Sequence, residues 1–249
     1  MCVKLPSRLS NCPIIDALVE LRFESNLNKS LIFGYMYKQI VELYPHEYPS
    51  GVISLPVLQI PEAIRNSDPN MRFKPLYRLE GKSTIIQIGN DVLCISPRMP
   101  YYGWNEFEKF TVALIDNIFQ ANIISRVVRL GHRYVNFFEG DIIHNLTLEL
   151  KTQGPYALDQ KMMVRSEVAD GNFTHVIQVS NNARYKKDAQ SVEISGSILD
   201  IDTSREYLDK YFQLHFSDEL NQAHDSEKKL FFSLLVPAYI DTLKPVYDE

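Results

Sequence analysis

Two arginines, Arg22 and Arg133, have the chemistry and the placement of a binding site. Each lies in a stretch of alternating apolar and polar residues, which predicts a half-buried strand, and each is on the side opposite the apolar set. A guanidinium group on an exposed sheet face binds a carboxylate, a phosphate or a side chain of a partner protein. The alternative is two surface arginines that pair with Glu20, Glu24 or Glu139.

An aromatic cluster adds two further candidates. Tyr101, Tyr102 and Trp104 come together where a helix is expected to begin. Such rings commonly pack a helix against a sheet, and the alternative is a platform on which a base or a peptide stacks. We therefore take Tyr102 and Trp104, with Arg22 and Arg133, as the candidate ligand- or partner-binding residues. We expect no catalytic residues, no metal and no cofactor.

A metal-dependent nuclease would need two carboxylates and a lysine around a cation, in the order Asp and later Glu-x-Lys. Asp68 with Glu80-Gly81-Lys82 matches this pattern, and so does Asp141 with Glu149-Leu150-Lys151. The pattern is short, and a chain with 23% charged residues contains it by chance. Glu80-Gly81-Lys82 also has the composition of a hairpin turn.

Other catalytic motifs are missing from the sequence. It contains no HExxH pair, no GxSxG elbow, no GxxxxGK[ST] loop and no GxGxxG fingerprint, so zinc proteases, serine hydrolases, P-loop enzymes and Rossmann oxidoreductases have no support. The three cysteines, Cys2, Cys12 and Cys94, have no metal-site spacing and predict reduced thiols. Asp200-Ile201-Asp202 places two carboxylates on one strand face, which we interpret as a solvated strand end.

Composition points to an ordinary globular protein. The 249 residues are 45% hydrophobic and carry a formal net charge of −5. An acidic balance disfavours a general nucleic-acid binder, which needs a basic face. No apolar stretch approaches the roughly 20 residues of a membrane span, and the first residues do not form a signal peptide, so we expect a cytoplasmic protein.

The coarse elements follow from periodicity and from turn residues. Residues 1–122 predict a first α+β half, with strands at 14–24, 73–79, 84–88 and 92–96 and helices at 29–44 and 104–120. Residues 123–249 predict a second half, with strands at 127–138, 162–169, 173–179 and 191–202, a short helix or turn at 141–146, a linker at 203–216 and a helix from 217 that kinks or restarts at Pro237.

The two halves read alike, which predicts an internal duplication. Leu21-Arg22-Phe23 is echoed by His132-Arg133-Tyr134 at the same place in the second half. One apolar side per strand fits an antiparallel sheet with helices on one face. We therefore expect an α+β fold of ten or nearly ten strands and four helices, in a layout like that of the TATA-binding protein.

Three stretches resemble a known family. Residues 13–23 (PIIDALVELRF), 102–107 (YGWNEF) and 129–136 (RLGHRYVN) resemble the "PI-EA--E-RF", "Y-GW--F" and "LRY-N" motifs of a sporadically distributed family of uncharacterised bacterial proteins of about this size. The chain departs from the family at Asp16, where Glu is usual, and at His132, where Leu is usual. The resemblance implies relatives scattered through bacteria and implies no activity.

These observations favour a non-enzymatic protein-interaction module with a protein partner, of the kind found in toxin–antitoxin or defence gene pairs. The alternative is a sensor of a small ligand or a nucleic acid on the open sheet face, with Arg22 and Arg133 as anchors. A metal-dependent nuclease is the second alternative.

Overall fold

The computed structural model describes residues 4–149, 161–187 and 190–248. Within these residues the fold is α+β, as predicted, with a large antiparallel sheet of nine strands. In order across the sheet they are β3 (Val52–Ser54), β4 (Tyr77–Glu80), β5 (Thr84–Ile88), β6 (Val92–Pro97), β2 (Ile14–Glu24), β7 (Arg126–Glu139), β10 (Ile194–Glu206), β9 (Phe173–Tyr185) and β8 (Met163–Asp170). The short strands β1 (Arg8–Leu9) and β11 (Pro245–Val246) pair with each other.

Helices lie between some of these strands and after β10. They are α1 (Lys29–Leu43), α2 (Glu62–Ser67), α3 (Pro69–Arg72), α4 (Trp104–Gln120), α5 (Tyr211–Leu234) and α6 (Pro237–Thr242), with short 3₁₀ turns at η1 (Pro56–Gln59) and η2 (Ile143–Asn145). None of the helices in the described ranges is both long enough and apolar enough to cross a membrane.

The chain divides into two compact units, which are described one at a time. Unit 1 holds the described residues of Met1–Ala17, Arg133–Thr203 and Ala223–Glu249. Unit 2 holds Leu18–His132 and Ser204–Gln222. Units 1 and 2 are defined by compactness, and the duplication of residues 1–122 in 123–249 stays a prediction.

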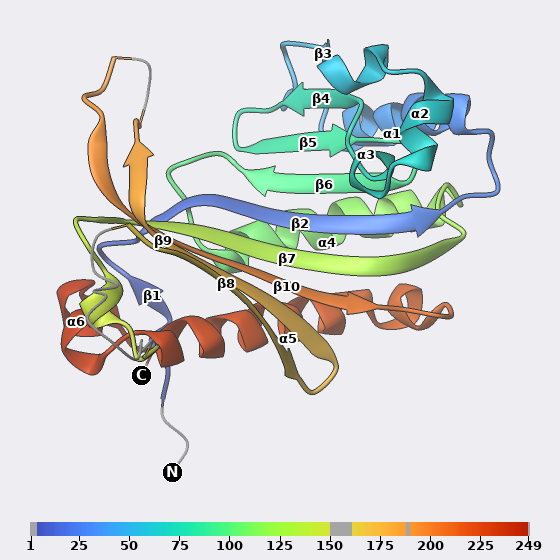
Figure 1. Ribbon diagram of the computed structural model, residues 1–249. Helices are drawn as coiled ribbons and strands as arrows, with labels where there is room; N and C mark the ends of the chain where they lie inside the picture. The colour runs from blue at the N-terminus through green and yellow to red at the C-terminus, as the bar shows by residue number, and fades with distance from the viewer. Residues whose placement is uncertain (1–3, 150–160, 188–189, 249) are drawn as a thin grey trace. The chain divides into compact units, whose positions relative to one another are not determined.

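The strands of unit 2 follow the period-two patterns of the sequence. Val19, Leu21 and Phe23 of β2 are fully buried, whereas Arg22 between them is only half-buried. Figure 1 shows β4, β5 and β6 side by side next to β2. The predicted bounds of β2 and β5 are confirmed, and β6 extends one residue further, to Pro97.

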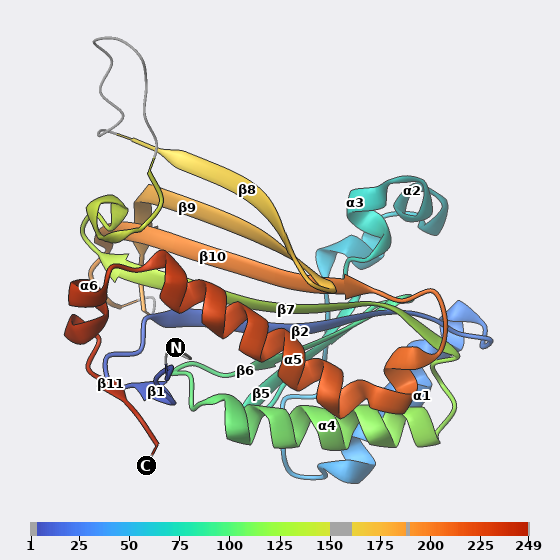
Figure 2. The ribbon, with the colours of Figure 1, turned by 90° about the horizontal axis from the view of Figure 1, so that it is seen from below.

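Two helices cover one face of these strands. The helix α1 begins after Asn28, whose side chain accepts a hydrogen bond from the N–H of Ser30, as expected of an N-cap. The helix α4 has the predicted bounds, and its apolar face is buried. Figure 2 shows α1 and α4 on the same side of the unit 2 strands. The local patterns therefore predict these elements because each buries a stripe against the sheet.

The opposite face of unit 2 carries structure that the sequence did not predict. The short helices α2 and α3 lie on the other side of the strands from α1 and α4, so helices are not confined to one face (Figure 2). The predicted strand at 73–79 is also shorter, because β4 begins only at Tyr77. Phe73 instead lies against the guanidinium group of Arg22, whose carbon is 4.5 Å from the ring centroid.

Unit 1 has its own apolar core. Phe138 from β7, Ile177 from β9 and Leu199 from β10 pack together with Leu235, which follows α5. Apolar residues of α5 and α6 pack against this cluster, among them Leu230. Of the kink or restart predicted at Pro237, the structure shows the restart, because α6 begins there.

Gly196 in β10 is required by the close approach of β7. A Cβ atom added at this position would lie 2.6 Å from Cζ of Phe137 and closer still to the carbonyl oxygen of Phe138. The backbone cannot move away without breaking the strand pairing, so we expect Gly196→Ala to destabilise the fold by about 1–3 kcal/mol. Chemical denaturation measures the change. Gly34→Ala in α1, where nothing lies within 4 Å, is the control and should not destabilise.

The prediction of a linker at 203–216 is wrong. The strand β10 continues to Glu206, and α5 begins at Tyr211 rather than at Ser217. A kink at His215, with φ −132° and ψ 20°, separates the first turn of α5 from the long remainder. The charged and polar composition of this segment resembled a loop, but tertiary packing holds it as a strand end and a helical turn.

Candidate functional site

Arg22, in unit 2, is bound by its own sheet. Its Nε donates to Oε1 of Glu20 at 2.7 Å, and Nη1 of Arg129 donates to the same oxygen at 2.8 Å. The side chain of Glu20 is only 16% exposed, so this shared pair is largely shielded from water. Pairing with Glu20 is one of the partners predicted from the sequence, and the guanidinium also stacks on Phe73.

Arg133, in unit 1, forms a two-point ion pair with a different partner. Its Nε donates to Oδ1 of Asp200 at 2.7 Å, and its Nη2 donates to Oδ2 at 2.6 Å. Hydrogen bonding to Asp200 raises the pKa of Arg133, and Asp202 and Asp16 act on it electrostatically as well. The surroundings of Arg133 are therefore acidic. Asp16 is itself affected, because burial raises its pKa.

The interpretation of Asp200-Ile201-Asp202 as a solvated strand end is wrong, as the position of Asp200 shows. Its side chain is only 13% exposed, and β10 continues beyond it to Glu206. The sheet brings β7 beside β10, which places Arg133 opposite this carboxylate. The partner lies 67 residues away in sequence, so local spacing could not reveal it.

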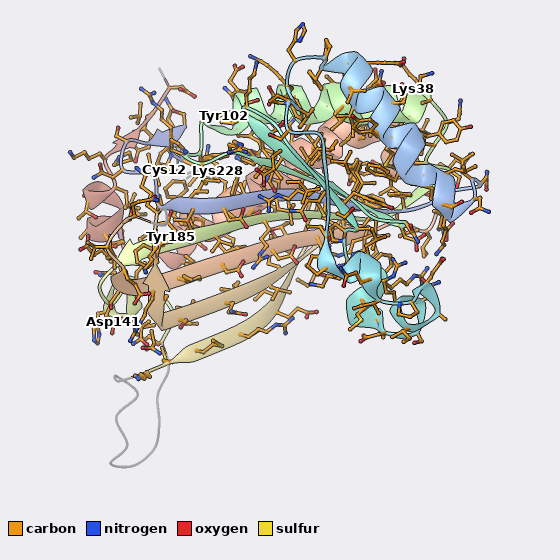
Figure 3. All side chains as sticks on the ribbon, turned by 90° about the horizontal axis from the view of Figure 1, so that it is seen from above. Cys12, Lys38, Tyr102, Asp141, Tyr185 and Lys228 are labelled. Carbon is orange, nitrogen blue, oxygen red and sulfur yellow. The ribbon has the colours of Figure 1, made fainter. Side chains whose placement is uncertain are left out.

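Tyr102 and Trp104, both in unit 2, have different surroundings. Tyr102 lies between β6 and α4 (Figure 3), is 40% exposed, and has a pKa raised to about 12, chiefly by burial of part of its side chain. Trp104 donates its indole N–H to Oδ1 of Asn221 at 2.9 Å and meets the ring of His132 edge-on at 4.9 Å. His132 is itself fully buried. Trp104 thus packs α4 in place, whereas Tyr102 is accessible to a partner.

In the first nuclease pattern, Glu80 is held by arginines. Glu80 forms ion pairs with Arg78 and Arg98, each at 3.1 Å. Leu150 and Lys151 of the second pattern lie outside the described residues, as does Cys2. Within the part of the chain that the structure describes, no three His, Cys, Asp or Glu side chains are grouped so that they could hold a metal ion.

Unit 1 contains a buried polar network that was not predicted from the sequence. His175 of β9 is 1% exposed, and both of its ring nitrogens are hydrogen-bonded. Nδ1 is 2.8 Å from Oγ1 of Thr203, and Nε2 is 3.1 Å from Oγ of Ser226. Ser226 in turn donates to Oδ2 of Asp170 at 3.2 Å. Burial lowers the pKa of His175, so its ring is neutral near neutral pH.

The proton positions in this network follow from the donors available. Because the hydroxyl proton of Ser226 goes to Asp170, the serine oxygen accepts from Nε2–H of His175. Nδ1 then carries no proton and accepts from the hydroxyl of Thr203. Thr203 also hydrogen-bonds with Glu227, a fully buried carboxyl of α5 whose pKa is raised well above its usual range by burial. This hydrogen bond with Thr203 acts against burial and lowers the pKa of Glu227.

This network does not have the geometry of a hydrolase triad. In such a triad the carboxylate binds the nitrogen of histidine that faces away from the serine. Here Ser226 and Asp170 both lie on the Nε2 side of His175, at 3.1 and 4.0 Å, and Thr203 occupies Nδ1. The residues come from four segments of the chain, and only their arrangement in the fold brings them together. We therefore assign the network a structural role.

An exposed apolar ridge lies in unit 2, where the sequence predicted a linker. Leu208, Tyr211 and Leu214, which we call the 208–214 ridge, are 92%, 42% and 78% exposed. Isolated exposed leucines are common on protein surfaces, but three large apolar side chains within one short segment are not. Charged residues of both signs, Asp209 and Lys210 among them, are exposed beside them.

The ridge is held by buried groups of the same segment. Phe212 points inward, is fully buried, and meets Phe119 edge-on at 6.3 Å. Arg205 donates from Nη1 to both carboxylate oxygens of Glu219 at 2.7 Å, and the hydroxyl of Tyr207 donates to Oε2 of Glu219 at 2.5 Å. Glu219 is fully buried. These bonds fix the turn that presents the ridge.

One sequence signal could have indicated the ridge. Leu208, Tyr211 and Leu214 recur at three-residue spacing, and Phe212 and Phe216 are apolar between and after them. That spacing is typical of a helical turn rather than of a polar linker. Which apolar side chains point outward depends on the kink at His215, and the sequence gives no sign of the kink.

The comparisons with known proteins give no family for this chain. No protein-family model matches it, and a search of curated proteins finds no match.

Proposed function

We propose that the protein is a non-enzymatic protein-interaction module and that it binds its partner through the 208–214 ridge. The observation that carries this proposal is the exposure of Leu208 and Leu214, at 92% and 78%, on a turn fixed from beneath by buried side chains. Because the turn is already fixed, binding does not have to order its backbone, which favours affinity.

The surroundings of the ridge fit a folded protein partner. Tyr211, whose ring centroid lies 5.2 Å from the guanidinium carbon of Arg205, is of a residue type that often dominates binding energy at interfaces. Exposed charges of both signs around apolar anchors resemble the rim of a protein interface. The partner we infer presents an apolar groove with charges at its border. The scattered family implied by the sequence motifs makes the products of neighbouring genes, as in toxin–antitoxin or defence pairs, the first partners to test.

The alternative of an anion sensor has less support. Arg22 and Arg133 are each bonded to a carboxylate of their own unit, so a phosphate or carboxylate ligand would have to displace Glu20 or Asp200. Removing one partner of a shielded ion pair leaves the other unpaired, which is costly. Cytoplasmic location and membership of the sporadically distributed bacterial family are likewise proposals that rest on the sequence.

We also propose that the chain arose by duplication and has a layout like that of the TATA-binding protein. The strand order supports this idea, since β4, β5 and β6 run inward to β2, and β8, β9 and β10 run inward to β7. A long helix follows each set, α4 in the first half and α5 in the second.

The proposed function predicts the effect of placing charge on the ridge. In a tagged chain purified from its native host, Leu208→Asp with Leu214→Asp should abolish recovery of the partner, because the partner would have to desolvate two carboxylates. Stability should change by less than about 0.5 kcal/mol, since both side chains are exposed. Leu31→Asp with Tyr35→Asp on α1, where both residues are about half-exposed, is the matched control and should leave recovery intact. Equal recovery by all three proteins would refute the proposal.

A further inference from the structure

The strand β8 in unit 1 has an edge without a strand beside it. It stands last in the strand order and pairs with β9 on one side, and no strand of the described residues pairs with its other side. Figure 3 shows β8 as the outermost strand next to β9. Its burial pattern is exposed at seven of eight positions, with Val164 half-buried. An edge of this length offers backbone donors and acceptors to a further strand.

The pairing with β9 fixes which backbone groups of β8 point outward. The hairpin closes on Asp170 and Phe173, and at its other end Asn181 donates its N–H to the carbonyl of Met162 at 3.3 Å. Hydrogen-bonded positions alternate along an antiparallel strand, so the even-numbered residues of β8 bond to β9. The N–H and C=O groups that point outward belong to the odd-numbered residues, which are Met163, Arg165, Glu167 and Ala169.

The sequence of β8 is complementary to itself about Ser166. Arg165 and Glu167 flank this residue, and Val164 and Val168 flank them in turn. If a second copy pairs antiparallel with Ser166 opposite Ser166, each Arg165 lies opposite a Glu167 and each Val164 lies opposite a Val168. The two charged pairs lie on one face of the sheet and the two apolar pairs on the other.

This register also aligns the backbone. Arg165 and Glu167 both point their N–H and C=O groups outward, so each such pair exchanges two hydrogen bonds, and Met163 with Ala169 does the same. Sliding one copy by two residues keeps the backbone aligned but places Arg165 opposite Arg165, or Glu167 opposite Glu167. Like charges directly opposite are unfavourable, so one register is selected.

We propose that the chain forms a two-fold symmetric homodimer in which the β8 strands of two copies pair antiparallel about Ser166. The occupant of this edge is a second copy because the opposite charges are placed symmetrically about one residue, which an unrelated strand would have no reason to match. The dimer surface belongs to unit 1 and is distinct from the 208–214 ridge of unit 2.

Charge reversal tests the register. Sedimentation velocity of the full chain should give twice the monomer mass of 28.8 kDa. Arg165→Glu places glutamate opposite glutamate at both pairs and should weaken the dimer at least tenfold, and Glu167→Arg should do the same. The double exchange, Arg165→Glu with Glu167→Arg, restores opposite charges and should restore the dimer. Arg184→Glu, at an exposed position on β9, is the control and should remain dimeric.

A cysteine at the symmetry axis tests the geometry independently. Opposed residues that do not exchange hydrogen bonds have Cβ atoms about 4.5–5.5 Å apart, so Ser166→Cys should form a disulfide between two copies under mild oxidation. Val164→Cys lies away from its own symmetry mate and should not. Cys12, which is exposed, is first replaced by serine, and Cys2 is replaced as well. A monomeric wild type would overturn the proposal, and so would a dimer that resists both charge reversals and lacks the Ser166→Cys cross-link.

Discussion

Glu219→Ala should destabilise the protein by about 3–5 kcal/mol, the range for removing one partner of a buried ion pair. Glu219 is fully buried and accepts from Arg205 twice and from Tyr207 once. Alanine leaves the Arg205 guanidinium and the Tyr207 hydroxyl without their acceptor in a place that water reaches poorly, and the desolvation of both groups is then uncompensated. Denaturation by urea, followed by circular dichroism, measures the loss.

Two further variants separate the charge of Glu219 from its shape. Glu219→Gln keeps an acceptor oxygen in the same volume and should lose less stability than alanine. Asp218→Asn removes an exposed carboxylate from the neighbouring position of the same helix and should change stability by less than about 0.5 kcal/mol. If Glu219→Ala and Asp218→Asn proved equally mild, the buried pair would not hold the turn beneath the ridge.

Glu227→Gln should make the protein more stable than the wild type, and the advantage should grow as pH rises. Burial raises the pKa of Glu227 well above its usual value of 4.5, so the folded state keeps this proton after the unfolded chain has released it. A carboxyl whose pKa is higher in the folded state than in the unfolded state contributes its full stability when pH is below the pKa of the unfolded state. That contribution is lost as pH rises toward the pKa of the folded state. A glutamine side chain does not ionise, so the variant does not lose stability in this way as pH rises.

The amide can also replace the bonds of the protonated acid. Its oxygen can accept from the N–H of Tyr134, which is 2.8 Å from Oε1 of Glu227, and its NH₂ can donate to Thr203. His175 has a lowered pKa and destabilises the fold as pH falls below its usual value of 6.5, but it does so in both proteins. The difference between the two unfolding free energies therefore isolates Glu227.

The measurement is the free energy of unfolding of both proteins in steps from pH 5 to pH 9. We expect the two curves to diverge as pH increases, with Glu227→Gln above the wild type. Asp225→Asn on the same helix removes a carboxylate whose pKa is lowered, chiefly by a hydrogen bond from His224, so it should not give a stabilisation that grows with pH. A constant difference between Glu227→Gln and the wild type would show that Glu227 is ionised in the folded protein.

The sequence predicts those parts of the fold that are set by local patterns. The bounds of β2, β5 and α4 follow from periodicity because each element buries one regular stripe of apolar side chains. The helices α2 and α3 were missed because they are short and lie among prolines that are more typical of loops. The end of β10 and the start of α5 were missed because packing around Phe212 outweighs their polar composition.

The candidate site likewise has contacts that the sequence predicts and contacts that it does not. The pair of Arg22 and Glu20 was predictable because two residues of one strand separated by one position share a face. The partner of Arg133 was not, because Asp200 becomes its neighbour only through the order of strands in the sheet. The 208–214 ridge depends on a kink and on an inward-pointing Phe212, and both are properties of the tertiary structure.

Photo-cross-linking in living host cells tests the central claim most directly, because it records what touches the ridge without purification. A photoreactive phenylalanine analogue is placed at Leu208, at Leu214 or, as the control, at Lys38 on α1, which is exposed (Figure 3). We predict one covalent product with the same partner protein from positions 208 and 214 and no such product from position 38. No product from either leucine position, or the same products from all three positions, would contradict the assignment of the ridge as the binding surface.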